Sequence, residues 1–334
     1  MNAWLKSLMP AKSGKALPVL SFPAVSLMGV TVRELISDSD LQAKGMKAVA
    51  DRVDSAASVS FMDLSVEAEA FGAQIVVSDD EVPTIKDRIV FDEDGANELA
   101  VPSVGDARTG IYIDAIKKAC ELITDRPVLA GIIGPFSLAA RLMDVTEIMV
   151  NCYDEPDMVH TVLNKTTAFL IEYAKAYKAA GASGIVMAEP VSGLLSPMLE
   201  EEFSSPYVKM IVDAVQDESF TVIYHNCGAG VPRMLDSILS VGAAAYHFGN
   251  AINLKTDILD KVDASTVVMG NIDPAGVLRM GTPELVREKT LELLKECGGY
   301  DNFVLSSGCD IPPLAPWDNL DAFFGAYEEY KKNI

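Results

Sequence analysis

Eight short apolar runs, separated by longer stretches of helical character, constrain the fold of this chain more than any other feature. Each run is bounded by turn residues, which is typical of a strand that is buried on both faces. Strands that alternate with helices form a parallel sheet, and this number of them predicts a closed barrel. The runs span residues 18–26, 57–65, 127–135, 184–190, 221–228, 243–249, 266–273 and 302–310.

Helix signals lie between the runs. Residues 156–180 read as a helix that begins at a proline and ends before Gly181. A second helix begins at Ser196–Pro197 and is expected to break at Pro206. No G-x-G-x-x-G sequence follows any run, which disfavours a dinucleotide-binding sheet.

Two segments fall outside this repeat. Residues 66–124 are too long for one crossover helix, so they are expected to form an insertion between strands 2 and 3, with a hairpin at 75–91 and a helix at 111–123. Residues 1–17 read as an N-terminal arm. The prediction is an α/β fold, a (β/α)8 TIM barrel, that occupies residues 1–334 as a single domain.

Composition excludes several classes of partner. The chain has 27 Lys and Arg against 48 Asp and Glu, a formal charge of -21, which argues against binding to nucleic acid or to an anionic membrane surface. No apolar stretch is long enough to span a membrane and no secretory signal is evident. The five cysteines are an odd number in a long chain, so we expect free or metal-bound thiols and a cytoplasmic location.

Polar side chains gather at the ends of the runs, where barrels of this type carry their chemistry. Two of the three histidines and two of the five cysteines are in this set. The residues are Asp63, Glu189, His225, Asn226, Cys227, His247, Asn250, Asn271, Asp273, Cys309 and Asp310.

One histidine and two cysteines in this set suggest a metal site. His225 and Cys227 are two apart in an extended segment and face the same side, and Cys309 ends the last run, at the same mouth of a barrel. One imidazole nitrogen and two thiolates suit Zn²⁺ with an open position for substrate, which His247 or Glu189 would fill at rest. The alternative is that the cysteines are small buried hydrophobes.

Several motifs resemble the uroporphyrinogen decarboxylase superfamily, and within it the corrinoid-dependent methyltransferases. That branch carries a His-x-Cys and a distant Cys as zinc ligands, which map onto His225, Cys227 and Cys309. The motifs are MDLSVEAEAFGA (62–73), GPFSLAARLM (134–143), EPVSGLLSPMLEEEFSSPYVKMI (189–211), HNCG (225–228), GNIDP (270–274) and SSGCDIPP (306–313).

The resemblance implies a reaction and its partners. A methyl group would pass from a methylcobalamin-type corrinoid to a small thiol such as coenzyme M or homocysteine. The corrinoid would arrive on a separate small protein, since no Asp-x-His-x-x-Gly sequence occurs here. A homodimer is one oligomeric state that we consider for the chain. Position at the strand ends assigns Asp63 and Glu189 as catalytic, and Asn271, Asp273 and His247 as substrate-binding, with Asp273 also a candidate to orient a zinc ligand.

Other functions of the same superfamily fit less well. The decarboxylase carries an Arg-Gln-Ala-Gly-Arg stretch after its first strand, whereas residues 21–35 have only Arg33, and a porphyrinogen with many carboxylates needs several fixed cations. Asp63 does match the position of the decarboxylase's catalytic aspartate. A third branch methylates tetrahydrofolate without zinc, and a last alternative is a non-catalytic protein that only binds a corrinoid protein.

Overall fold

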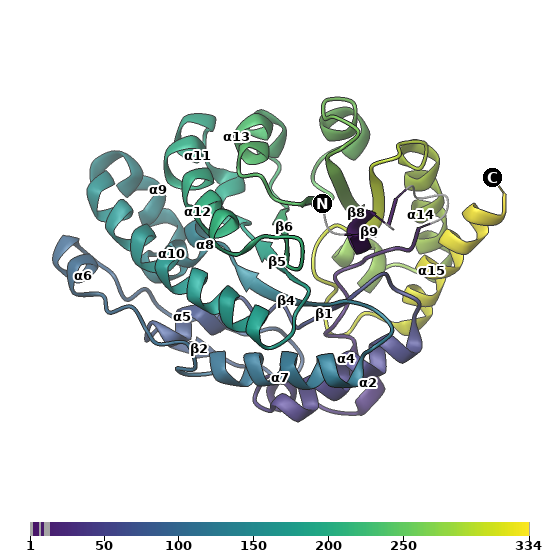
Figure 1. The fold of residues 1–334 in the computed structure, drawn as a ribbon, viewed down its shortest axis with the longest axis horizontal. Coiled ribbons are helices and arrows are strands. Elements are labelled where there is room, and N and C mark those ends of the chain that lie inside the picture. Colours follow the sequence, from purple (N-terminus) through teal and green to yellow (C-terminus); the bar gives the residue numbers. More distant parts are fainter. Residues whose placement is uncertain (1–2, 7, 10–13, 334) are drawn as a thin grey trace.

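A curved sheet of seven parallel strands forms the centre of the molecule (Figure 1). The computed structural model describes residues 3–6, 8–9 and 14–333. Neighbours in the sheet follow one another along the chain, as in a barrel built of successive β-α units. The strands are β1 (Ser58–Val59), β4 (Val128–Ile133), β5 (Gly184–Ala188), β6 (Thr221–Asn226), β7 (Ala245–Phe248), β8 (Val267–Ile272) and β9 (Phe303–Ser307).

Helices surround this sheet on its outer side (Figure 1). The α-helices are α1 (Ala3–Lys6), α2 (Ala24–Met28), α3 (Val32–Ile36), α4 (Ser39–Arg52), α5 (Val66–Ala70), α6 (Glu93–Glu98), α7 (Thr109–Leu122), α8 (Pro135–Met143), α9 (Val145–Asp154), α10 (Pro156–Ala179), α11 (Pro197–Phe203), α12 (Ser205–Val215), α13 (Leu235–Ser240), α14 (Pro283–Cys297) and α15 (Trp317–Lys332). Shorter helical turns are η1 (Val191–Leu194), η2 (Val231–Arg233), η3 (Lys255–Leu259) and η4 (Pro274–Arg279).

The expected helix signals are confirmed. The helix that begins at Pro156 runs to Ala179. The expected break near Pro206 divides α11 from α12, with Ser204 between them. In the insertion, β2 (Ile75–Val76) and β3 (Thr84–Ile85) pair as an antiparallel hairpin, and α7 covers most of the expected helix.

The first apolar run, residues 18–26, is not a regular strand, which corrects that part of the prediction. Pro18 has no N–H to give to a strand ladder. Pro23 lies at the N-terminal cap of α2, which takes up the end of the run. Apolar character alone therefore predicted burial correctly here but not strand geometry.

The same segment nevertheless closes the barrel between its two edge strands. The N–H of Leu17 donates to the carbonyl of Leu305 on β9 at 2.9 Å, and the N–H of Ala56, ahead of β1, donates to the carbonyl of Ala16 at 2.9 Å. Residues 16–19 thus occupy the first strand position with fewer backbone hydrogen bonds than a regular strand would make.

Alternate strand residues divide the core into two buried clusters, as the two-residue period of a strand requires. One cluster fills the barrel and includes Val186, Ile223 and Val304, and the other lies between sheet and helices. Leu5 and Leu8 of the N-terminal arm belong to the inner cluster, so the described part of the arm contributes to the barrel core.

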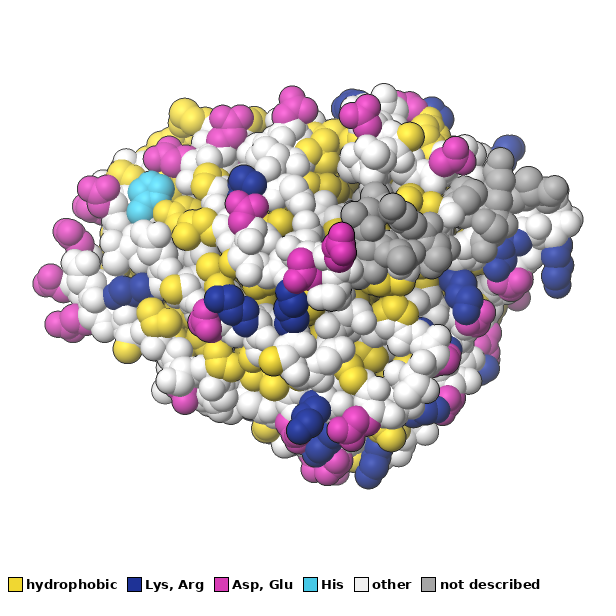
Figure 2. Space-filling view, viewed as in Figure 1, with side chains coloured by type: hydrophobic (Ala, Val, Ile, Leu, Met, Phe, Trp, Pro, Cys, Tyr) yellow, Lys and Arg dark blue, Asp and Glu magenta, His cyan; other side chains and the backbone are white. Residues whose placement is uncertain are grey.

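Most charged side chains lie on the outside, and Asp63, Arg108 and Glu189 are among the buried exceptions. Figure 2 shows acidic and basic side chains interspersed with hydrophobic ones over the face in view, and many of them form exposed ion pairs such as Arg287 with Glu329. Within the described residues, no helix combines the length and the apolar character that crossing a bilayer requires.

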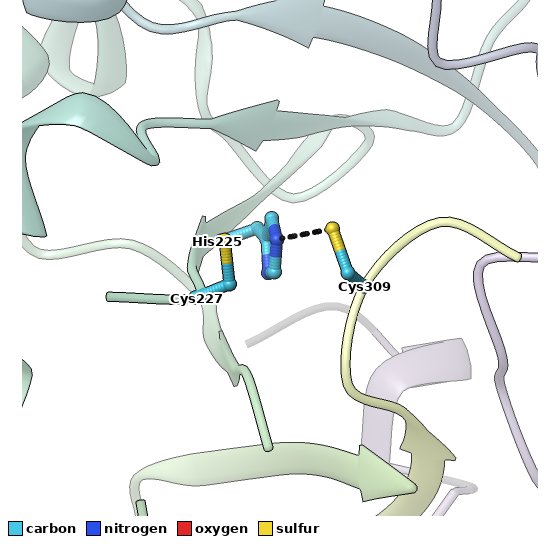
Figure 3. Close-up of side chains that lie close together, drawn as sticks. All are labelled: His225, Cys227 and Cys309. Atoms are coloured by element: carbon cyan, nitrogen blue, oxygen red, sulfur yellow. Dashed lines mark hydrogen bonds between the residues drawn. The ribbon is translucent and has the colours of Figure 1, made fainter. Parts of the chain in front are cut away.

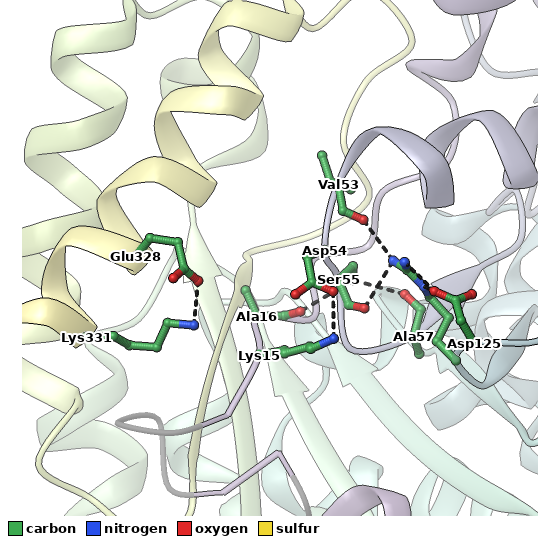
Figure 4. A network of polar contacts seen from close by, with 10 residues as sticks. Lys15, Ala16, Val53, Asp54, Ser55, Ala57, Asp125, Glu328 and Lys331 are labelled. Atoms are coloured by element: carbon green, nitrogen blue, oxygen red, sulfur yellow. Dashed lines mark hydrogen bonds and ion pairs between the residues drawn. The ribbon is translucent and has the colours of Figure 1, made fainter.

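Polar contacts fix the loop that leads into β1. Arg126, whose side chain is 11 % exposed, donates through Nη1 to the carbonyls of Val53 at 2.8 Å and Ser55 at 3.2 Å. Figure 4 shows this loop beside the ion pair of Lys15 and Asp54. The guanidinium therefore satisfies two carbonyls that no strand ladder reaches.

Replacing Arg126 by alanine is expected to lower the free energy of unfolding by about 1–3 kcal/mol, because it leaves both carbonyls without a donor. Urea unfolding followed by circular dichroism measures this. The control is Lys15→Ala, which breaks a pair whose side chains are 51 % and 71 % exposed, and which should cost about 1 kcal/mol or less. Equal losses in the two variants would contradict the role given to Arg126.

Candidate metal centre

Three predicted ligands converge at the carboxyl ends of two strands. His225 lies in β6, Cys227 follows that strand directly, and Cys309 follows β9. Their ligand atoms all lie within 4.8 Å of one another, and Figure 3 shows the three side chains around one space. Among the histidine, cysteine and acidic residues that the structure describes, these three form the group that could hold a metal ion.

The donor set fits a tetrahedral zinc ion. A nitrogen about 2.1 Å and a sulfur about 2.3 Å from one zinc ion lie about 3.6 Å apart, and His225 Nε2 is 3.4 Å from Cys309 Sγ. A hydrogen bond with Cys309 lowers the pKa of Cys227 to about 4, although burial opposes the shift. The same contact raises the pKa of Cys309. The two sulfurs thus share one proton, and a divalent cation would replace it and hold both as thiolates.

His247 lies behind His225 rather than beside the two cysteines. The register pairs the two histidines across β6 and β7, and their Nδ1 atoms are 2.6 Å apart. The Nε2 atom of His247 lies 2.8 Å from Ser306 Oγ. Burial, and then the charge of His225, lowers the pKa of His247 well below its usual value. Both ring nitrogens are engaged, so the structure places His247 as a hydrogen-bond partner of His225 and Ser306.

Glu189 follows β5 and is fully buried. Its Oε1 accepts a hydrogen bond from the N–H of Ser137 at 2.5 Å, at the start of α8, where backbone N–H groups are free to bind an anion. Its Oε2 has no hydrogen-bond partner among the residues that the structure describes. Burial raises the pKa of Glu189 to about 8. A Cβ atom at Gly134 would lie 1.7 Å from Oε2, so the glycine before α8 is what admits this carboxyl.

Asp63 follows β1 and is held by the insertion. Its carboxylate forms an ion pair with Arg108 and accepts hydrogen bonds from Tyr112 Oη at 3.1 Å and Ser65 Oγ at 2.6 Å. The Asp63 side chain has no exposed surface. Its partners are arginine, tyrosine and serine, so the carboxylate joins α7 to the mouth of the barrel.

Asn271 lies near the end of β8 and Asp273 follows this strand directly. Asn271 Nδ2 donates to the carbonyls of Gly249 at 2.9 Å and Ile252 at 3.1 Å. Asp273 Oδ1 accepts from two N–H groups in the first turn of η4, which is helix capping. Both residues line a cavity of about 310 Å³ that α14 also borders.

Comparison with known proteins gives the family. The family model for uroporphyrinogen decarboxylase (URO-D) matches residues 16–330. The chain belongs to the URO-D family. This span includes every strand of the sheet and all three metal-ligand candidates.

Proteins whose names describe two different reactions are similar to the chain. A methylcobamide:CoM methyltransferase of Methanosarcina acetivorans is 29 % identical over 273 residues, which cover 80 % of this chain and 78 % of that protein. A uroporphyrinogen decarboxylase of Methylobacillus flagellatus is 27 % identical over 304 residues, 88 % of this chain and 84 % of that protein. A solved methyltransferase from Methanosarcina mazei has the same fold, with a TM-score of 0.86, 24 % identity and coverage of 97 % and 98 % of the two chains.

Sequence reasoning missed three polar residues that shape this URO-D-family site. Ser306, which contacts His247, is a small polar residue in an apolar run, and that contrast was a usable signal. Arg108 and Ser137 gave no signal in the sequence. Arg108 lies in the insertion and reaches Asp63 from there. Ser137 contacts Glu189 through its backbone N–H, which every residue except proline has.

The Glu189→Gln variant tests the assignment of a buried protonated carboxyl. The pKa of Glu189 is about 8 in the folded chain against an ordinary 4.5. The folded state therefore keeps a proton that the unfolded state releases between these values, and the free energy of unfolding falls as pH rises through this range. Urea unfolding from pH 5 to pH 8 should show a smaller decline in Glu189→Gln than in the wild type. Identical pH slopes would mean that Glu189 is not buried as an acid.

Proposed function

We propose that this URO-D-family chain is a methyltransferase that moves a methyl group from a methyl-corrinoid to a small thiol, with zinc at His225, Cys227 and Cys309. One observation carries the proposal, which is the convergence of one imidazole nitrogen and two sulfurs within 4.8 Å. Such a soft donor set with three protein ligands is typical of a catalytic zinc site with an open position.

The protein side of the reaction follows from the three ligands. Bound zinc would supply the positive charge that keeps the acceptor thiol as a thiolate at neutral pH. His225, Cys227 and Cys309 hold it at the mouth, where the acceptor has access. Neither His247 nor Glu189 belongs to the group of ligand atoms, so we assign the fourth position to the acceptor sulfur. Methyl transfer would form a carbon–sulfur bond on the acceptor as the carbon–cobalt bond of the donor breaks, and the electron pair of that bond would leave with the corrinoid.

The other five residues predicted for the site receive their roles in the proposal from the contacts that they make. Asp63 and Glu189 shape the mouth, since each ties a helix to the end of a strand. Asn271 holds the loop after β7, and Asp273 caps the turn after β8. His247 contacts the metal ligand His225. We therefore assign all five to the arrangement of the substrate site rather than to bond making.

The similarity to a methylcobamide:CoM methyltransferase supports the corrinoid as methyl donor and coenzyme M as one acceptor, and homocysteine has the same reacting group. A separate small corrinoid protein would bring the donor to the barrel mouth. A cytoplasmic location, a homodimer and a single domain over residues 1–334 belong to the same proposal.

Decarboxylation is the second candidate, because decarboxylases are also among the relatives. That reading centres on Asp63. The Asp63 side chain is unexposed and paired with Arg108 in this structure, and the arginine therefore neutralises the acid instead of facing a substrate carboxylate. The observed contacts favour methyl transfer.

Cys309→Ser is expected to lose both bound zinc and thiol methylation, because a serine hydroxyl is a poor zinc ligand. The wild type should hold about one zinc per chain by elemental analysis and should methylate coenzyme M or homocysteine from methylcobalamin. Cys120→Ser is the matched control, since Cys120 is a half-buried thiol on α7 outside the metal group, and it should keep both properties.

Wild-type protein that methylates a thiol at full rate without any metal would contradict the proposal. So would metal-free protein that decarboxylates uroporphyrinogen, and Asp63 would then become the centre of the reaction.

A further inference from the structure

A chain of buried hydrogen bonds runs from the metal centre into the barrel wall. His225 Nε2 lies 3.4 Å from Cys309 Sγ, and His225 Nδ1 lies 2.6 Å from His247 Nδ1. His247 Nε2 lies 2.8 Å from Ser306 Oγ, which is 2.7 Å from the carbonyl oxygen of Leu17. The two histidines and Ser306 are at most 3 % exposed, so water does not supply alternative partners.

The carbonyl end of this chain fixes the direction of each hydrogen bond. A carbonyl oxygen only accepts, so the Ser306 hydroxyl donates its proton to Leu17. The Ser306 oxygen is then the acceptor for His247, whose Nε2 carries the proton. A neutral imidazole has one donor and one acceptor nitrogen, so His247 Nδ1 accepts from His225 Nδ1–H.

The metal end gives the same proton positions independently. A metal-binding imidazole nitrogen needs a free lone pair, so a proton on His225 must sit on Nδ1 and leave Nε2 bare. The backbone oxygen of His247 is 3.2 Å from His225 Nδ1, and this atom too can only accept. Both lines of argument therefore give the same hydrogen bond between the two rings, in which His225 Nδ1–H donates to His247 Nδ1.

We propose that Leu17, Ser306 and His247 act as a relay that holds His225 in the Nδ1–H tautomer and so keeps its Nε2 ready for the metal. The inference rests on the proposed function, because it takes His225 as a ligand. His247 and Ser306 are positioning residues, since they act through His225. The relay begins at the segment that closes the barrel in place of a first strand, so Leu17 takes part in barrel closure through its N–H and in the relay through its carbonyl.

Without the Ser306 hydroxyl, the Nε2–H of His247 has lost its acceptor. The His247 proton can then move to Nδ1 and donate toward His225, whose own proton shifts to Nε2 and blocks the metal. Partners of metal-binding histidines typically change metal affinity about 10–100-fold when removed. The relay therefore predicts that Ser306→Ala weakens zinc binding by about this factor.

Nitrogen-15 NMR of the zinc-loaded wild type reads the tautomers directly, and the chain has only 3 histidines to resolve. Two-bond nitrogen–proton couplings should show His225 protonated at Nδ1 and His247 protonated at Nε2. A His247 ring protonated at Nδ1 would overturn the relay and leave the proposed function intact. Wild-type protein that binds no zinc would instead contradict the proposed function.

Chelator competition on variants gives the second measurement. Ser307 is the matched control for Ser306, because it is equally buried on β9 and its hydroxyl accepts from the N–H of Val19 at 3.0 Å. Ser307→Ala should bind zinc as the wild type does. His247→Asn keeps an acceptor near the place of Nδ1 and should bind zinc more tightly than His247→Leu. Equal affinities of Ser306→Ala and Ser307→Ala, or of the two His247 variants, would overturn the relay.

Discussion

The lateral register of the parallel strands is the constraint on which the rest of the site depends. The hydrogen-bonded register aligns His225 on β6 with Ala188 on β5 and with His247 on β7. Further along the same sheet, Ser306 on β9 is aligned with Asn271 on β8. A slip of one residue would turn each side chain to the opposite face of its strand, and would separate the metal ligand from its neighbours.

The sequence predicted the barrel and the grouping of the three candidate metal ligands, because both leave local signals. Buried strands are short apolar runs, and the ligands of the mouth follow those runs directly, as His225, Cys227 and Cys309 do. The missing first strand had the same apolar signal, and only its two prolines, Pro18 and Pro23, distinguished it from a true strand. Its replacement by backbone contacts of residues 16–19 depends on neighbours far along the chain, at Leu305 and Ala56.

Contacts between distant segments could not be predicted in the same way. Asp63 was expected to be catalytic from its place after a strand, but its ion pair with Arg108 joins residues 45 positions apart. The contact of His247 with Ser306 joins residues 59 positions apart. The sequence shows the type of each residue and its position after a strand. The hydrogen-bond or ion-pair partner that decides its chemistry is set by tertiary packing, which the sequence does not show directly. This is why the assigned role of Asp63 shifts from catalysis to positioning.

Two buried acids near the mouth, Glu189 and Asp63, contribute little net charge in this arrangement. Glu189 keeps a proton because burial raises its pKa to about 8, and Asp63 is neutralised by Arg108. Among the described residues, the two cysteines and one nitrogen of His225 form the group that could bind a metal ion. The excess of acidic side chains therefore lies on the outer surface, and the groups that could bind a metal at the mouth are two cysteine sulfurs and one imidazole nitrogen.

The most direct test of the account is zinc X-ray absorption spectroscopy of the protein before and after addition of the acceptor thiol. We predict two sulfur ligands with one imidazole before addition, and three sulfur ligands once coenzyme M or homocysteine binds. A sulfur count that stays at two with either thiol, or a metal bound only by nitrogen and oxygen, would contradict the claim that this barrel mouth activates a thiol for methylation.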